Sequence, residues 1–156
     1  MFKGKKIVVG VTGGIAAYKT CGLVSALRKQ DAEIDVVMTK NATEFVAPLT
    51  FETLSSRPVT VDTFNRRAPW EVEHIALAKK ADLFVIAPAT ANFIGKYACG
   101  IADDMLTTTV MATRAPVLVV PAMNTGMYES AAVTGNIATL KRRGVSVMEA
   151  ASGRLA

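Results

Sequence analysis

Short apolar runs alternate along the chain with longer segments that mix apolar and polar residues. The runs are rich in β-branched residues, and uninterrupted apolar runs of this length are typical of strands buried on both faces of a parallel sheet. The pattern predicts strands at residues 6–11, 33–38, 83–87, 117–120 and 145–148. We expect prolines to end the third and fourth of these strands, because proline has no backbone N–H to donate.

The segments between these runs have the composition and periodicity of helices. We expect helices at residues 15–29, 42–47, 48–55, 75–80, 91–97, 103–113 and 131–143. The polar stretch 62–73 is predicted to be a surface loop, and Gly144 is expected to follow the last helix at its C′ position. Because strands alternate with helices, the predicted fold class is α/β: one three-layer, doubly wound parallel sheet, flavodoxin- or Rossmann-like.

The composition agrees with one folded domain outside the membrane. Hydrophobic residues make up 51% of the 156 residues and charged residues 20%, which excludes disorder caused by low hydrophobicity. The longest uncharged stretch, residues 115–128, is shorter than the about 20 apolar residues of a membrane span. No secretory signal pattern follows the N-terminal lysines, so we expect a cytoplasmic protein with no membrane partner.

The positive charge admits a nucleic acid as partner, but its distribution weakens that interpretation and suits a small phosphorylated ligand equally well. The net charge is +5, but the basic residues lie in small separate groups without interleaved aromatic residues. Only two cysteines and one histidine are present, in no zinc-binding spacing, so we expect no metal site. Because the basic groups are separate, we also expect no nucleic-acid partner.

The first strand is followed by a turn of small residues, where ligands of doubly wound sheets bind. Thr12 and Ile15 stand where a dinucleotide fingerprint has glycines, and Tyr18 replaces the second glycine of a Walker A loop. What remains is a turn at a helix N-terminus that is able to hold one phosphate. The hydroxyls of Thr12, Thr39 and Thr90 are expected to assist.

One phosphate at this position suggests a mononucleotide such as FMN. The alternative is that Gly13 and Gly14 only allow the helix to pack closely on the strand. The residues themselves leave both interpretations open.

Two strands are each followed by a proline and then by an asparagine. Asn92 and Asn124 offer amide donors and carbonyl acceptors for a carboxylate or for the polar edge of a flavin ring, although either could serve as a helix cap. His74 is the chain's only histidine, the side chain best suited to proton transfer near neutral pH. A lone histidine is more often structural than catalytic.

These motifs together resemble the homo-oligomeric flavin-containing Cys decarboxylases. The resemblance covers the whole chain and is closest to the family's phosphopantothenoylcysteine decarboxylases, found as the N-terminal domain of bifunctional bacterial proteins of coenzyme A biosynthesis. The residues that carry it are Thr-Gly-Gly-Ile-Ala-Ala-Tyr-Lys at 12–19, His74, Pro-Ala-Thr-Ala-Asn at 88–92, Gly-Ile-Ala-Asp-Asp at 100–104 and Pro-Ala-Met-Asn-Thr-Gly-Met-Tyr at 121–128.

The resemblance implies a role for each matching residue. His74 would be the active-site histidine, and Asn124, with Met127 nearby, would hold the carboxylate of 4′-phosphopantothenoylcysteine. FMN would be held by Gly13, Gly14, Ile15, Thr39, Thr90, Ala91, Asn92 and Ala122.

The resemblance also implies the order of the reaction. FMN oxidises the cysteinyl thiol to a thioaldehyde, which provides an electron sink for the departing CO2. The resulting enethiol takes back hydride from reduced FMN and a proton, which gives 4′-phosphopantetheine. The implied assembly is a trimer or a dodecamer, with the flavin near subunit contacts.

The end of the chain departs from the family pattern. The family's proton donor is a cysteine on a flap, and residues 151–156, Ala-Ser-Gly-Arg-Leu-Ala, stop where that cysteine would follow. Cys21 and Cys99 lie in other contexts and do not replace it. We therefore expect residues 1–156 to be an FMN-binding decarboxylase domain, truncated before the flap and separated from a ligase domain. We expect it to reach the enethiol and to complete the reduction poorly.

Two other functions remain open. One is decarboxylation of a peptidyl cysteine, against which Tyr18 and Lys19 favour the coenzyme A branch. The other is a non-catalytic flavin-binding regulatory subunit, and the presence of both His74 and Asn124 argues against it.

Overall fold

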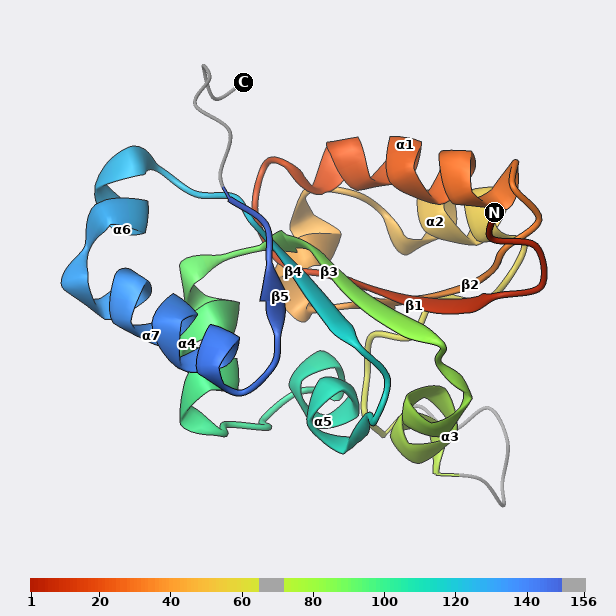
Figure 1. Cartoon of the computed structure of the whole chain (residues 1–156). Helices are drawn as coiled ribbons and strands as arrows, with labels where there is room; N and C mark the ends of the chain where they lie inside the picture. The colour runs from red at the N-terminus through yellow and green to blue at the C-terminus, as the bar shows by residue number, and fades with distance from the viewer. Residues whose placement is uncertain (65–71, 150–156) are drawn as a thin grey trace.

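The computed structural model describes residues 1–64 and 72–149, which contain one parallel sheet of five strands in the order β2-β1-β3-β4-β5 (Figure 1). This is the strand order of flavodoxin-like sheets. The strands are β1 (Lys6–Val11), β2 (Glu33–Met38), β3 (Leu83–Ala89), β4 (Val117–Pro121) and β5 (Ser146–Val147).

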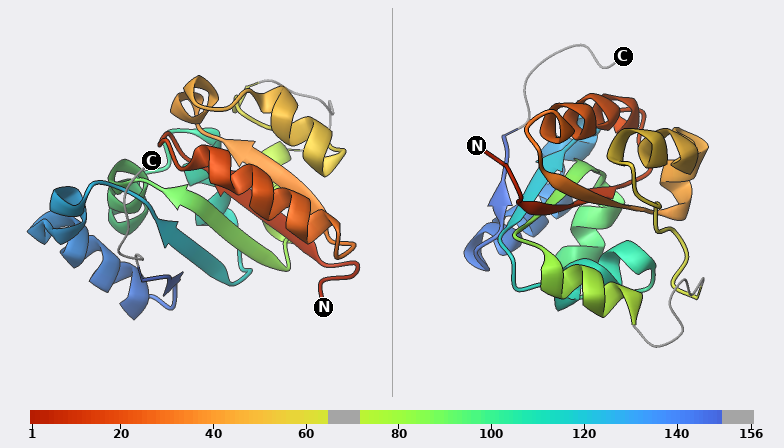
Figure 2. Two further views of the ribbon diagram at one scale, coloured as in Figure 1. Left: turned by 90° about the horizontal axis from the view of Figure 1, so that it is seen from above. Right: turned by 90° about the vertical axis from the view of Figure 1, so that its right-hand side faces the viewer.

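Helices cover both faces of this sheet, so the predicted three-layer arrangement is confirmed (Figures 1 and 2). On one face lie α1 (Ala17–Arg28) and α2 (Pro48–Ser55), which follows the short 3-10 helix η1 (Lys40–Glu44). The other face carries α3 (Glu73–Lys80), α4 (Ala91–Cys99), α5 (Met105–Ala112) and α7 (Ala131–Arg142), with α6 (Thr125–Glu129) just before α7.

Two apolar cores result from the alternation of side chains along the central strands. In β1, Ile7 and Val9 are buried beneath α1 and α2, whereas Val8 packs into the core beneath α4, α5 and α7. β3 divides in the same way, with Val85 in the first core and Phe84 in the second. Burial on both faces explains why these strands read as continuous apolar runs.

Most predicted elements are observed, and several have the predicted bounds. The strands 6–11 and 33–38 and the helix 48–55 agree with the structure residue for residue. Gly144 follows α7 with φ +85°, a left-handed conformation suited to the C′ position. Residues 65–71 of the predicted loop 62–73 lie outside the described residues.

Some observed elements differ from the predicted ones in type or length, or were not predicted. The helix predicted at 42–47 is the 3-10 helix Lys40–Glu44, because the Thr39 hydroxyl accepts from the Ala42 N–H at 3.2 Å and starts the turn earlier. Glu73, placed in the loop, already belongs to α3, the last strand has only two residues, and α6 was not predicted. None of the helices in the described residues has the length and hydropathy of a membrane span.

The prediction that Pro88 ends the third strand was wrong. β3 continues to Ala89, and its pairing with β4 shifts register between Ile86 and Ala89. Buried threonine hydroxyls serve the carbonyls at this irregular point: Thr20 Oγ1 donates to the Ala87 oxygen at 2.7 Å, and Thr12 Oγ1 to the Pro88 oxygen at 2.6 Å. The strand therefore tolerates its proline because side chains replace part of the regular pairing.

We predict that Thr20→Val lowers the free energy of unfolding by about 1–3 kcal/mol, because the Ala87 carbonyl loses a buried partner while side-chain volume is kept. Urea denaturation measures the change. Thr53→Val is the matched control, since the Thr53 hydroxyl only bonds the Leu49 carbonyl on an exposed helix surface. The control should stay within about 0.5 kcal/mol of the wild type. Equal losses in both variants would contradict the role given to Thr20.

Candidate functional site

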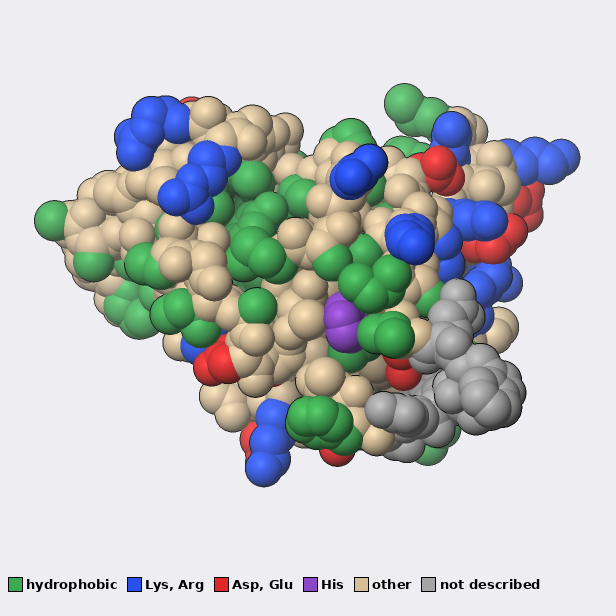
Figure 3. Space-filling view, turned by 90° about the horizontal axis from the view of Figure 1, so that it is seen from below, with side chains coloured by type: hydrophobic (Ala, Val, Ile, Leu, Met, Phe, Trp, Pro, Cys, Tyr) green, Lys and Arg blue, Asp and Glu red, His purple; other side chains and the backbone are tan. Residues whose placement is uncertain are grey.

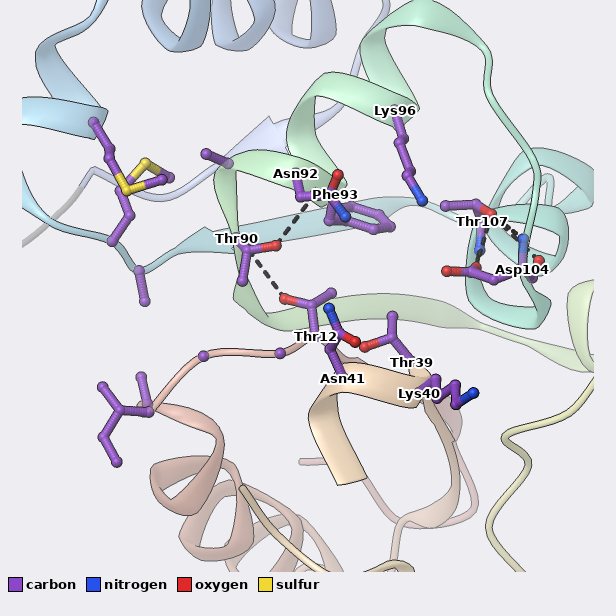
Figure 4. A pocket seen from close by; sticks show the side chains of 18 of the residues that line it. Thr12, Thr39, Lys40, Asn41, Thr90, Asn92, Phe93, Lys96, Asp104 and Thr107 are labelled. Carbon is purple, nitrogen blue, oxygen red and sulfur yellow. Dashed lines mark hydrogen bonds between the residues drawn. The ribbon is translucent and has the colours of Figure 1, made fainter. Parts of the chain in front are cut away.

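A pocket of about 530 Å³ lies at the carboxyl ends of β1, β2, β3 and β4, in the size range of small-molecule sites (Figure 4). It collects the first residues after each of these strands, together with one side of α4 and the start of α5. The lining residues are Thr12, Gly13, Gly14, Ile15, Ala16, Thr39, Lys40, Asn41, Thr90, Ala91, Asn92, Phe93, Lys96, Asp104, Thr107, Ala122, Met123, Asn124 and Met127.

Every residue that the sequence predicted to contact cofactor or substrate lines this pocket, except His74. The ones brought together are Gly13, Gly14, Ile15, Thr39, Thr90, Ala91, Asn92, Ala122, Asn124 and Met127. Strand ends at one edge of a parallel sheet explain this convergence.

The threonines at the strand ends of the pocket, Thr12, Thr39 and Thr90, differ in their hydrogen bonds. Thr12 is 1% exposed, and its hydroxyl donates to the Pro88 carbonyl and accepts from the Thr90 N–H at 3.0 Å. Its single proton is therefore committed, and the expectation that Thr12 assists a phosphate was wrong. The hydroxyls of Thr39 and Thr90 accept from the Ala42 and Phe93 N–H groups at helix starts, and no hydrogen bond of the described residues uses their protons. Those two hydroxyls can donate to a ligand.

The start of α4 adds backbone donors. Thr90 is its N-cap, and the next two residues, Ala91 and Asn92, also line the pocket. The first N–H groups of a helix have no partner inside it, and they carry the positive end of the helix dipole. This part of the pocket suits an anion.

The two glycines of the first turn meet different surroundings. A Cβ on Gly13 would lie 2.5 Å from the Asn41 Cβ and 3.0 Å from the Asn41 carbonyl carbon, so Gly13 is needed for close packing against η1. A Cβ on Gly14 would meet only the Thr90 Cγ2, at 3.5 Å. Packing thus explains Gly13, whereas Gly14 leaves space in the pocket itself.

The two asparagines are not equivalent. The Asn124 Oδ1 accepts from the Gly126 N–H at 2.8 Å and caps α6, which leaves the amide NH2 group available to a ligand. Asn92 is the second residue of α4 and has an exposed side chain, and the cap of that helix is Thr90. The helix-cap interpretation is therefore correct for Asn124 and wrong for Asn92.

Several lining residues were missed from the sequence. Lys96 and Lys40 lie at one end of the pocket, where the Lys96 ammonium contacts both Asp103 oxygens at 2.9 and 3.0 Å (Figure 4). Asp104 and Thr107 form a capping box that fixes the start of α5 at the same end (Figure 4). A usable signal was present, because an aspartate and a threonine three residues apart before an apolar run is a helix-start pattern.

His74 lies apart from this pocket in its own chain. It is the second residue of α3, half-buried, and is not part of the pocket lining. The space-filling view shows the chain's only histidine at the surface among hydrophobic side chains (Figure 3).

Neither cysteine belongs to the pocket. Cys21 lies in α1 and packs against the core beneath that helix, and burial raises the pKa of its thiol. A raised pKa keeps a thiol protonated and unreactive. Cys99 is exposed at the end of α4. These positions agree with the expectation that neither cysteine replaces the proton donor of the family.

Comparison with known proteins places these features in a family. The model of the family described as Flavoprotein matches residues 1–156. This chain belongs to the Flavoprotein family.

Within the curated members of this family, bifunctional proteins are similar to the chain. It is 50% identical over 153 residues to the coenzyme A biosynthesis bifunctional protein CoaBC of Vibrio vulnificus (strain YJ016), a match to 98% of this chain. The CoaBC protein of Bacillus subtilis (strain 168) is 49% identical over 156 residues, all of this chain. The chain spans 38% of the length of each of these relatives.

Solved structures of decarboxylases have the same fold. The FMN-dependent cysteine decarboxylase SpaF superposes with a TM-score of 0.89 at 34% identity, covering 94% of this chain and 85% of SpaF. A PPC decarboxylase mutant complexed with pantothenoylaminoethenethiol gives a TM-score of 0.84 at 29% identity, covering 99% of this chain and 86% of that one.

The glycine turn leads to a paired prediction. Gly13→Ala should lower the free energy of unfolding by about 1–3 kcal/mol, because the added Cβ meets the Asn41 backbone. Gly14→Ala should leave stability within about 0.5 kcal/mol but weaken flavin binding, because its Cβ narrows the pocket beside Thr90. Urea denaturation and flavin fluorescence titration measure the two effects. Flavin affinity unchanged in Gly14→Ala would show that this turn does not approach the ligand.

Proposed function

We propose that this chain is an FMN-dependent decarboxylase that converts 4′-phosphopantothenoylcysteine to 4′-phosphopantetheine in coenzyme A biosynthesis. The observation that carries the proposal is the convergence of phosphate donors and the free Asn124 amide in one pocket. Its similarity to CoaBC proteins, at about half of all positions, supports the choice of substrate. Residues 1–156 would then be the decarboxylase domain of such a bifunctional protein.

The pocket has hydrogen-bond donors for the phosphate of FMN and an apolar rim for its flavin ring. The free hydroxyl protons of Thr39 and Thr90 and the N–H groups at the start of α4 would hold the phosphate. Ile15, Met123 and Met127 form an apolar rim suited to a flavin ring. The pairing of an anion-binding end with an apolar end is what a flavin mononucleotide requires.

Two side chains of this chain would then orient the substrate carboxylate and transfer protons. A carboxylate on a saturated carbon lacks an electron sink, and FMN, when bound, would supply one through its redox chemistry, by reversible oxidation of the neighbouring carbon–sulfur group. Asn124 orients the carboxylate through its amide NH2 group, whose direction is set because Gly126 holds the carbonyl side of the amide. His74 would take and return protons at the reacting thiol.

We infer that His74 serves the pocket of a second copy of the chain. Two observations support self-association: the pocket rim carries the exposed side chains of Ile15 (53%) and Met127 (49%), and Phe64 (88%) and Val72 (57%) lie exposed near His74 in sequence. Apolar exposure of this kind is typical of protein interfaces. A trimer, or a dodecamer built from four trimers, would bring these surfaces together in a closed ring of contacts.

A related cysteine decarboxylase is the second candidate, since SpaF is similar to this chain over 94% of its length. That function would need a different cysteine-containing substrate, such as a peptide that ends in cysteine. Comparing kcat/KM for such a peptide and for 4′-phosphopantothenoylcysteine decides between the two substrate classes. A preference for the peptide would overturn the proposal.

We predict that the purified chain shows the absorption bands of oxidised flavin and releases CO2 from 4′-phosphopantothenoylcysteine. His74→Asn should reduce CO2 release by about 100-fold, because proton transfer by a side chain contributes at least that much. Flavin content should not change. Lys79→Ala, at an exposed position of the same helix, is the matched control. A protein that takes up no FMN, or an active His74→Asn variant, would count against the proposal.

A shared site predicts complementation between two inactive variants. His74→Asn keeps an intact pocket, and Asn124→Asp keeps an intact histidine but repels the substrate carboxylate. When the two are co-expressed with different tags, about one in four neighbouring pairs joins an intact histidine to an intact pocket. We therefore expect about a quarter of wild-type CO2 release from the whole co-expressed population, in which oligomers of a single variant contribute none. Activity no higher than that of the separate variants would place both residues in one chain.

A further inference from the structure

The helix that carries His74 is attached to the sheet differently at its two ends. Its second half has three anchors. Leu77 and Ala78 are buried, the Thr113 hydroxyl donates to the Ala78 carbonyl at 3.0 Å, and the Lys80 ammonium contacts the Asp35 carboxylate at 2.9 Å. These contacts fix the C-terminal end of α3, which is the end distant from His74.

The first turn of α3 has a single side-chain anchor among the described residues. Its N-cap, Val72, provides no capping hydrogen bond. Instead, the Thr60 hydroxyl donates to Glu73 Oε1 at 2.7 Å, and Glu73 directly precedes His74. A hydrogen bond to a carboxylate is stronger than one between neutral groups, and a negative charge in the first turn also favours the helix dipole.

Thr60 is itself held firmly. It is 6% exposed and continues the sheet beyond β2, because its N–H donates to the Val36 carbonyl at 3.0 Å and its carbonyl accepts from the Met38 N–H at 2.9 Å. The hydroxyl that reaches Glu73 therefore projects from sheet backbone rather than from a loose loop. It does not line the pocket.

We propose that Thr60 is a positioning residue for the decarboxylation: its hydrogen bond to Glu73 fixes the first turn of α3 and thereby the imidazole of His74. The inference rests on the proposed function, in which His74 transfers protons. Displacing a reacting group by about 1 Å can reduce the rate by about 100-fold. The anchor should therefore affect the chemical step while leaving flavin binding unchanged.

The test compares substitutions that remove or keep the hydroxyl. Thr60→Val keeps the side-chain volume and should lower kcat for CO2 release by about 10-fold, with the KM and the flavin content close to those of the wild type. Thr60→Ser keeps the hydroxyl and should restore most of kcat. Thr113→Val is the matched control, because it removes the hydroxyl that bonds the Ala78 carbonyl near the other end of α3. It should lower the melting temperature as much as Thr60→Val does but retain kcat.

A double-mutant comparison separates positioning from general damage. If Thr60 acts through His74, Thr60→Val should lower the residual rate of His74→Asn no further. An additional loss in that background, an unchanged kcat in Thr60→Val, or equal defects in Thr60→Val and Thr113→Val would each overturn the inference. The proposed function fails separately, if the wild type releases no CO2 or His74→Asn is fully active.

Discussion

The irregular point in β3 is the constraint on which the site depends. The carbonyls of Ala87 and Pro88 lie where the pairing with β4 shifts register, and buried carbonyls need partners. Thr20 and Thr12 provide them across the sheet, and Thr12 also accepts from the Thr90 N–H. One hydroxyl thus joins the end of β1 to the start of α4, so the two sides of the pocket keep a fixed separation.

The hydrogen bond between Thr12 and Pro88 also shows why the local sequence pattern did not predict every strand end. The strand 6–11 was predictable because burial on both faces leaves a nearly continuous apolar run in the sequence. The strand 33–38 differs, since Glu33 and Asp35 stand at half-buried positions on either side of Ile34. The continuation of β3 through Pro88 was not predictable, because it depends on Thr12, which is 76 residues away along the chain. A proline predicts the end of a strand only when nothing else serves the neighbouring backbone groups.

The same division applies to the pocket. Residues that directly follow strands, such as Thr39, Thr90 and Asn124, could be predicted, because parallel strands bring their carboxyl ends to one edge. Lys96 and Thr107 reach the pocket from helix surfaces, and their direction depends on how α4 and α5 pack. His74 is a different case: the sequence identifies its chemistry, but its place at the start of α3, outside the pocket lining, depends on how the chain folds.

The strand β2 connects the pocket with the helix that carries His74. Its carboxyl end leads to Thr39 in the pocket, whereas Asp35 and the backbone pairing with Thr60 hold the two ends of the helix that bears His74. A sheet is stiff because each strand is hydrogen-bonded to its neighbours and packed on both faces. The position of Thr39 in the pocket and the position of the helix that bears His74 therefore both depend on β2. In the proposed assembly of identical copies, attachment to the same strand would give each histidine the same geometry relative to a neighbouring pocket.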